Sequence, residues 1–534
     1  MEAEEVNRQG SWDGFETFFP LLLGQVTSGE PIKMLLPGFP FKSPNSRDKV
    51  LSNLPDLGEK FALKHLNGLC ENTKAVYGHG AEVHITSDGL VYNEHYLANA
   101  SDIRQELTAR YGDSQFEADM AKKSSSDMQL TQTKYLEFLK SDLLLNKTWL
   151  AQSPEEQAVT ISETAKAMMG RWKVFAAALE VNRTDYVRLS IHDSEGRNKL
   201  SMALIPQKQR GALGATPWHS VVVAELDGSY RSVQRRTVGV DKYELIHHNG
   251  RPYFFRAKSD LFDWSADNCD VTFEHLYPSG LIIRPAAGAP SMTTIPMKKV
   301  CTLTNTFSPI ILRGFSNITE RDTFINSANE LGENLVWPQY GVMSVVKDVG
   351  KDDKNANNVI SKEAMPMHFD GISKYKDVTN PVTGAVTKML NPPGYQYFTC
   401  IATAPKGSGC ILFTASHLFF RYLSPPWSVE RPEPVTWGTH NTGFWKQDQE
   451  KLKLVVRHPA TGEPCLRWHE PWNKTKYSTC GVFIENEDQA LIDVINIGIY
   501  DWRSCLRFSW EQGDLMCSDN TAMLHTRSTY EYFD

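Results

Sequence analysis

Two segments that lie far apart in the sequence carry residue types that could bind a metal ion. The first, Met367–Asp370, contains the pattern His-x-Asp, and the second, Gly513–His525, ends in a further histidine. Side chains in an extended segment alternate in direction, so His368 and Asp370 would point the same way. Two imidazoles and one carboxylate on one face of Fe(II) leave the opposite face open for a chelating cosubstrate and O2. We therefore predict that His368, Asp370 and His525 are the ligands of a non-haem iron site.

A His-x-Asp tripeptide alone is weak evidence, since a chain with 15 histidines and 63 acidic residues contains such patterns by chance. The alternative is an ordinary surface or core histidine. The flanking sequence favours the iron site, because Phe307–Phe315 resembles the strand that opens the taurine dioxygenase (TauD-like) family. Trp510–Leu515 and Asp519–Arg527 resemble the strand pair around that family's distal histidine. The resemblance implies a double-stranded β-helix (jelly-roll) with flanking helices that uses Fe(II), 2-oxoglutarate and O2.

One residue of that family has no obvious counterpart. An arginine that follows the distal histidine usually binds the far carboxylate of 2-oxoglutarate, a task that suits the two-pronged guanidinium. Here the candidates are Arg527, on the same strand face as His525 if the segment is extended, and Arg507 on the preceding strand. The alternative for each is an ordinary exposed arginine. Ile411 also stands where relatives often place a threonine near the cosubstrate.

Length and composition limit the classes of protein that remain. A chain of 534 residues is too long for one core and suggests two domains of about 250 residues. A net charge of −7 without a long basic run argues against nucleic acid, and the apolar stretch at 18–26 is too short to span a membrane. Nine scattered cysteines predict reduced thiols in a cytoplasmic protein. We expect small-molecule partners, with the oligomeric state left open.

The best linker candidate is Arg284–Pro296, which is rich in proline, alanine and glycine. We therefore expect an N-terminal tail at 1–19, a first domain at 20–283, a linker at 284–300 and a second domain at 301–534. The first domain alternates a helical pattern that begins near Pro55 with strand patterns at Val187–Ile191 and Ser220–Ala224. An α/β fold follows.

Three polar segments of the first domain could form a second site. They are Pro37–Arg47, Arg188–His192 with Lys199 behind it, and Thr216–His219. Lys42, Arg47, Arg188 and Lys199 are suitable cations for anionic substrates, and His192 and His219 titrate near neutrality. The alternative is that these residues are solvated loop charges and edge-strand residues.

Together the three segments resemble the isocyanide (isonitrile) synthase family, which is related to pyoverdine and dityrosine biosynthesis proteins. The resemblance implies that an amino acid's amine forms a Schiff base with the ketone of ribulose 5-phosphate and gains one carbon. It further implies that Arg188, His192, Lys199 and His219 are catalytic. We hypothesise that Lys42 with Arg47, and Arg188 with Lys199, divide the phosphate and the substrate carboxylate between them, in an order left open.

The combination of both domains resembles the fungal two-domain isocyanide synthase–dioxygenases of the xanthocillin type. It implies that the first domain converts an L-amino acid, with tyrosine favoured, into an isocyano acid. The second would then decarboxylate this acid oxidatively to a vinyl isocyanide. The alternatives are β-hydroxylation of the isocyano acid, or activity in only one half of the chain.

Overall fold

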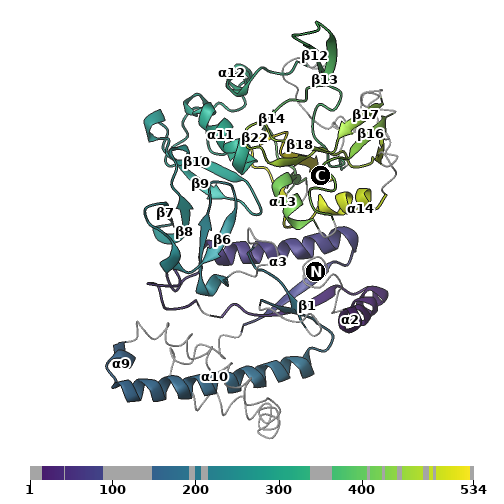
Figure 1. The fold of residues 1–534 in the computed structure, drawn as a ribbon. Helices are drawn as coiled ribbons and strands as arrows, with labels where there is room; N and C mark the ends of the chain where they lie inside the picture. Colours follow the sequence, from purple (N-terminus) through teal and green to yellow (C-terminus); the bar gives the residue numbers. More distant parts are fainter. Residues whose placement is uncertain are drawn as a thin grey trace. The chain divides into compact units, whose positions relative to one another are not determined.

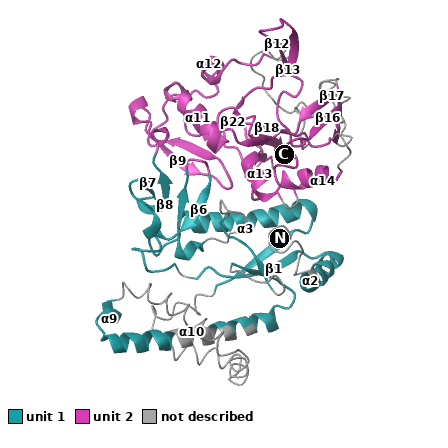
Figure 2. Ribbon diagram, in the orientation of Figure 1, with its two compact units in different colours: residues 1–225, 229–258 teal, residues 226–228, 259–534 magenta. Residues whose placement is uncertain are grey.

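The computed structural model divides the chain into two compact units, as the length predicts (Figures 1 and 2). The first comprises residues 1–225 and 229–258, and the second residues 226–228 and 259–534. The structure describes residues 15–40, 42–87, 147–191, 199–205, 215–336, 364–405, 409–423, 427–441, 448–472, 480–484 and 489–529.

The boundary between the units lies before the position that the proline-rich run indicates. Within the expected linker, β10 (Leu281–Pro285) pairs with β11 (Ile310–Leu312), and α11 (Met297–Phe307) begins. Met292 and Met297 are buried, so this stretch packs inside the second unit and does not link two units. The predicted boundary between an N-terminal tail and the first domain at residue 19 is also wrong, because α2 (Phe15–Ser28) spans this position.

A four-stranded parallel sheet organises the first unit. Its strand order is β2 (Ala81–Thr86), β1 (Ile32–Pro37), β3 (Val187–Ser190) and β4 (Leu200–Ser201). The chain leaves β1 through α3 (Leu57–Val76) to reach β2 on one side, and later enters β3 on the other side of β1. The carboxyl ends of β1 and β3 therefore form a topological switch point, where open α/β sheets bind ligands.

A mixed sheet and two further α-helices are the other main elements described in the first unit. The sheet order is β6 (Tyr230–Val233), β5 (Val221–Ala224), β8 (Arg251–Ala257) and β7 (Tyr243–His248), and the helices are α9 (Lys147–Leu150) and α10 (Pro154–Asn182). All four residues of β5 are buried, as its apolar sequence predicts. The α/β character expected of this half is present.

The second unit contains the sheets that carry the candidate metal ligands. One has the order β14 (Tyr395–Thr399), β22 (Leu515–Asp519), β11, β10 and β9 (Val271–His275), and another the order β21 (Cys505–Phe508), β15 (Ile411–Ala415) and β23 (Met523–Arg527). Smaller sheets are formed by β12 (Tyr375–Thr379) with β13 (Val386–Leu390), β17 (Gln449–Lys453) with β16 (Thr436–Asn441) and β20 (Cys480–Ile484), and β18 (Val455–Arg457) with β19 (Pro464–Leu466). The helices besides α11 are α12 (Arg321–Leu331), α13 (Ser416–Tyr422) and α14 (Gln489–Gly498).

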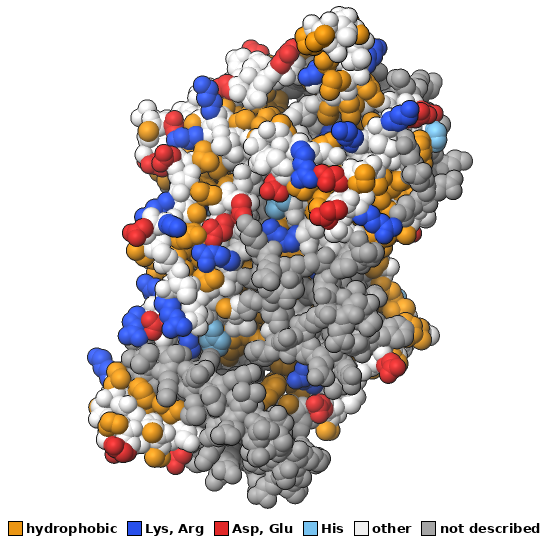
Figure 3. Space-filling view, in the orientation of Figure 1, with side chains coloured by type: hydrophobic (Ala, Val, Ile, Leu, Met, Phe, Trp, Pro, Cys, Tyr) orange, Lys and Arg blue, Asp and Glu red, His pale blue; other side chains and the backbone are white. Residues whose placement is uncertain are grey.

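The surface carries charges of both signs. On the face drawn in Figure 3, lysine and arginine side chains are interspersed with acidic ones over the coloured regions. None of the helices in the described part of the chain combines the length and the apolar character that a membrane crossing requires.

A buried ion cluster joins the loop after β1 to the start of α3. Asp56 caps the helix by accepting from Gly58 N at 2.9 Å, and Glu59 accepts from Asp56 N at 2.9 Å, which completes a capping box. Lys42 Nζ lies 2.6 Å from Asp56 Oδ2 and 2.8 Å from Glu59 Oε2. Burial raises the pKa of Asp56 to about 7 against the opposing attraction of Lys42. The cluster therefore holds the loop in place with charges that are removed from water.

This cluster predicts a pH-dependent stability. Because the pKa of Asp56 is raised on folding, its protonated form stabilises the fold fully below pH 3.8, and this contribution is lost as the pH rises toward 7. Asp56→Asn removes the titration, so its thermal midpoint should rise relative to the wild type between pH 5 and 7.5. The effect should reach up to about 3 kcal/mol, at about 1.4 kcal/mol per pKa unit.

Asp185→Asn is the control for the substitution itself, since Asp185 is 57% exposed in the same unit. Wild-type and Asp56→Asn midpoints that run parallel over this pH range would contradict the assignment.

Candidate functional site

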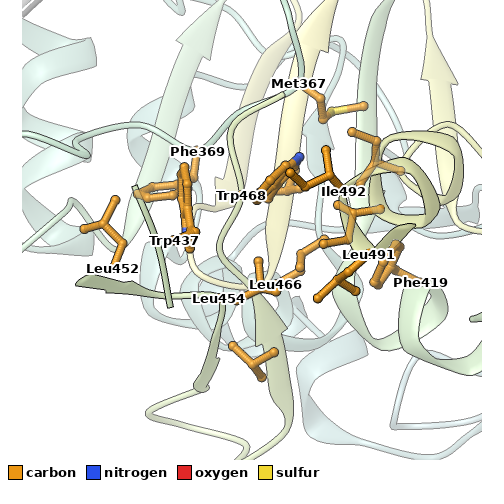
Figure 4. Close-up of a cluster of buried hydrophobic side chains, with 14 of the residues drawn as sticks. Met367, Phe369, Phe419, Trp437, Leu452, Leu454, Leu466, Trp468, Leu491 and Ile492 are labelled. Carbon is orange, nitrogen blue, oxygen red and sulfur yellow. The ribbon is translucent and has the colours of Figure 1, made fainter. Parts of the chain in front are cut away.

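The segment Met367–Asp370 has the alternation that the His-x-Asp pattern requires. Met367 and Phe369 are buried in a cluster that includes Trp437 and Trp468 (Figure 4). In an extended segment their neighbours point to the opposite side, which directs His368 and Asp370 away from this cluster. Two apolar side chains thus anchor the segment and two polar ones are presented together.

His525 reaches the same place from β23. Its backbone forms an isolated antiparallel bridge with His368, in which His368 N donates to His525 O at 3.0 Å and His525 N donates to His368 O at 2.8 Å. The two imidazole centroids are 4.4 Å apart. The structure therefore brings together three predicted residues that come from distant parts of the chain.

The three side chains are arranged as a metal site requires. One donor atom each of His368, Asp370 and His525 lies within 4.8 Å of the others. His368 Nδ1 lies 2.8 Å from Pro366 O, which places the proton on Nδ1 and leaves the lone pair on Nε2. Burial, followed by the nearby His368, lowers the pKa of His525 to about 4, so this imidazole is neutral at pH 7. These donors fit a divalent ion of the iron class.

Side chains from a separate part of the chain satisfy the backbone of the ligand segment. Glu470 accepts from Met367 N at 2.9 Å and its own N donates to Met367 O at 2.8 Å. His469 Nε2 lies 2.9 Å from Phe369 O. Asn520 Oδ1 accepts from Asp370 N at 2.9 Å, and Asn520 Nδ2 donates to Asp370 O at 3.0 Å. The ligand directions are thus set by bonds on both sides of each ligand.

Arg467 supports the side of the segment that faces the hydrophobic cluster. Its Cζ lies 3.5 Å from the centroid of the Phe369 ring, and its Nη1 donates to Asn520 O. Burial lowers the pKa of Arg467 to about 10. No sequence pattern predicted the roles of Glu470, His469, Asn520 and Arg467, and only Asn520 lies inside a segment with a recognisable motif.

The structure distinguishes the two arginines predicted to bind 2-oxoglutarate. In the pairing of β15 with β23, His525 lies opposite Phe413 and Arg527 lies opposite Ile411, so Arg527 and His525 share a face. Arg507 lies opposite Leu412 on the other face and is exposed. Arg507 is therefore misplaced for this role, because a one-residue change of register turns a side chain to the opposite face.

The predicted cations of the first unit differ in what already neutralises them. Lys42 is held by two carboxylates, and Arg47 is 59% exposed and paired with Asp48 at 2.8 Å. Arg188 on β3 is buried, its Nε has no hydrogen-bond partner within the described residues, and burial lowers its pKa. Lys199 Nζ lies 5.3 Å from the ring centroid of Trp172.

The three motifs of the first unit gather near the switch point. Ser43 N donates to Trp218 O at 2.9 Å, and the Phe39 and Trp218 rings are 5.2 Å apart, which joins the loop after β1 to the segment before His219. Arg188 lies opposite Leu35 in the pairing of β1 with β3. His219 ends a short 3-10 helix, Pro217–His219, while His192 lies outside the described residues.

Comparison with known proteins matches each unit to a different family model. Residues 23–96 and 93–246 match the pyoverdine/dityrosine biosynthesis protein family, and residues 293–532 match the taurine catabolism dioxygenase TauD, TfdA family. The isocyanide synthase xanB of Aspergillus fumigatus is 48% identical over 98% of this chain and 76% of its own length. The chain belongs to the isocyanide synthase family. It is a fused synthase–dioxygenase enzyme of isonitrile biosynthesis.

Two further relatives extend this comparison. Isocyanide synthase A of Aspergillus fumigatus is 32% identical over 97% of this chain and 92% of its own length. The tyrosine isonitrile desaturase of Erwinia amylovora is 22% identical over 47% of this chain and 82% of its own length.

Asn520 provides a test of how the ligand segment is held. Asn520→Ala removes its bonds to both backbone groups of Asp370 and the 2.7 Å bond to Pro393 O. The affinity of the full chain for Co(II), measured by calorimetric titration, should fall about 10- to 100-fold, as for other residues that orient metal ligands.

The control is Asn380→Ala, since Asn380 is exposed and its side-chain Oδ1 accepts from Val382 N and Thr383 N within one turn, away from the candidate ligands. An Asn520→Ala protein with wild-type affinity would show that the segment holds its geometry without this side chain.

Proposed function

We propose that the first unit converts an L-amino acid, tyrosine by preference, and ribulose 5-phosphate into an isocyano acid. The second unit then decarboxylates this acid oxidatively to a vinyl isocyanide. The observation that carries the proposal is the convergence of His368, Asp370 and His525 in the unit that matches the dioxygenase family. The name of the Erwinia amylovora relative supports both tyrosine and desaturation over β-hydroxylation.

In the first unit we assign the anionic substrate to Arg188. Arg188 is buried and its Nε lacks a hydrogen-bond partner within the described residues, so a substrate carboxylate or phosphate at the β1–β3 switch point would supply an acceptor and a second negative charge besides the nearby Glu180. Lys42 and Arg47 each lie against carboxylates, so we place Arg188 before them for the anion, and their role in binding the phosphate stays a prediction. Lys199, His192 and His219 remain the proposed cation and acid–base groups for imine formation and proton transfer.

In the second unit we propose that the sheets containing β22 and β23 are the two faces of a double-stranded β-helix. The His368–His525 bridge joins the ligand segment to β23, the strand that follows β22 in the chain. His368, Asp370 and His525 would hold Fe(II), and Arg527 would bind the far carboxylate of 2-oxoglutarate. The bound iron would supply the oxidising chemistry with 2-oxoglutarate and O2.

The proposed second reaction balances with one molecule of each co-reactant. The isocyano acid loses one hydrogen from its β-carbon and its carboxyl group as CO2, which leaves a carbon–carbon double bond. O2 accepts these two electrons and two more from 2-oxoglutarate, which is oxidised to succinate and a second CO2, and one water is formed. With only His368, Asp370 and His525 as protein ligands, a bound Fe(II) would keep positions for the cosubstrate and O2.

Single substitutions separate the two reactions. With L-tyrosine, ribulose 5-phosphate, Fe(II), 2-oxoglutarate and O2, the wild-type chain should give the vinyl isocyanide by mass spectrometry. His525→Ala should accumulate the isocyano acid instead. Arg188→Ala should make no isocyano acid yet convert added isocyano acid at the wild-type rate.

Each reverse result is informative. Isocyano acid production by Arg188→Ala at the wild-type rate removes Arg188 from the site, and its consumption by His525→Ala moves the metal centre elsewhere. A product that keeps the carboxyl group and gains one oxygen identifies hydroxylation.

The face assignment of the two arginines gives a matched pair of variants. Arg527→Ala should raise the KM for 2-oxoglutarate about 10- to 100-fold, because a charge-assisted hydrogen-bonded pair is lost. Arg507→Ala should leave this KM unchanged, and neither variant should alter isocyano acid production. The same KM for both variants would refute the role of Arg527.

A further inference from the structure

Gln396 contacts two of the three candidate ligands. It is the second residue of β14 and is 4% exposed. Its Nε2 donates to Asp370 Oδ2 at 2.9 Å and also lies 2.9 Å from His525 Nδ1. No pattern in the sequence pointed to this glutamine, because it reaches the site only through the pairing of β14 with β22.

The surroundings of Gln396 decide which way its amide points. Nε2 lies between two oxygen acceptors, Asp370 Oδ2 and Asn520 Oδ1, the second at 3.2 Å. The NH2 group therefore faces them, since the carbonyl oxygen in that position would face two acceptors. Asn520 Oδ1 is itself fixed by Asp370 N. The amide and the ligand carboxylate are thus parts of one hydrogen-bonded group.

Folding alone does not account for a glutamine at this position. Its Oε1 is buried and has no hydrogen-bond partner within the described residues. An unsatisfied buried acceptor destabilises a fold by about 1–3 kcal/mol, and an apolar side chain of the same shape would avoid this loss. The hydrogen bond from the Gln396 amide to Asp370 therefore explains why a glutamine occupies this position.

The hydrogen bond makes the two oxygens of Asp370 unequal. Oδ2 accepts from Gln396 and lies 3.9 Å from His525 Nε2, whereas Oδ1 lies 3.7 Å from His368 Nε2 and accepts no hydrogen bond within the described residues. An oxygen engaged by an N–H donor is a weaker metal donor than a free one. A carboxylate that binds through one oxygen occupies one position on the ion, and one that binds through both occupies two.

We propose that Gln396 is a positioning residue that keeps Asp370 bound to the metal through a single oxygen and so preserves the positions that the cosubstrate and O2 need. This inference rests on the proposed metal site. It assigns the residue no contact with substrate.

The test uses Gln396→Met, which keeps the length of the side chain and removes both polar groups. Co(II) is titrated into the full chain without cosubstrate and followed by calorimetry and visible absorption. We expect the Co(II) affinity to fall about 10- to 100-fold, and the absorption to change because Asp370 gains a second contact with the ion. The thermal midpoint of the metal-free protein should stay the same or rise, since a buried unsatisfied oxygen is removed.

Gln449→Met is the matched control. Gln449 is also a buried glutamine of the second unit, its Oε1 accepts from Tyr375, and its Nε2 lacks a hydrogen-bond partner within the described residues. Gln449 makes no hydrogen bond to His368, Asp370 or His525, all of which are described, so its replacement should leave the Co(II) affinity and spectrum unchanged. Gln396→Asn, which withdraws the amide by one methylene, should reproduce the spectral change if the methionine variant does not fold.

The outcomes separate this inference from the proposed function. If the wild type binds one Co(II) that His525→Ala abolishes, while Gln396→Met keeps the wild-type affinity and spectrum, the positioning role is wrong and the metal site stands. If the metal-free Gln396→Met protein loses thermal stability and keeps its affinity, the glutamine is merely structural. If His525→Ala binds Co(II) as the wild type does, the metal site itself is refuted.

Discussion

The second unit depends on how one short extended segment is held. Met367–Asp370 must bury two apolar side chains on one side and present two polar ones on the other, although it lies in no regular sheet. Its backbone groups are bonded by His525, Glu470, His469 and Asn520, which come from separate parts of the chain. Buried backbone groups must be satisfied, so these bonds both stabilise the segment and direct its ligands. The metal geometry and the fold are therefore consequences of the same contacts.

In the first unit, the buried cations differ in whether a carboxylate lies close to them, and we assign them different roles for this reason. Lys42 lies against Asp56 and Glu59, and this cluster joins the loop after β1 to the start of α3. Arg188 is also buried, but no carboxylate of the described residues lies within ion-pair distance of it, and the nearby charge of Glu180 only partly opposes the lowering of its pKa by burial. A buried cation that the fold leaves unpaired suits an anionic substrate, whereas a paired one serves the structure. Residue type alone does not separate these two cases.

The sequence predicted a helix or strand correctly where the residues that determine it lie within that element. The helix predicted to begin near Pro55 is present, with its capping box at Asp56 and Glu59 and with Leu57, Phe61, Leu66 and Leu69 buried. The strand at Val221–Ala224 was equally clear. The linker was predicted at 284–300 from the proline and glycine content of that run. This content does not show whether the run packs against strands elsewhere in the chain. Whether Met292 and Met297 are buried depends on β11 and β22, which lie later in the chain.

The sequence by itself determined which residue types meet at the candidate metal centre. The period of two in an extended chain sets His368 and Asp370 on one side, and the order of motifs identified His525. Tertiary structure decided the rest, because it depends on register between strands that are distant in sequence. The β15–β23 and β15–β21 pairings place Arg527 beside His525 and turn Arg507 away. The β14–β22 pairing brings Gln396 to Asp370. The residue pattern around Gln396 or around Asp370 does not predict this contact.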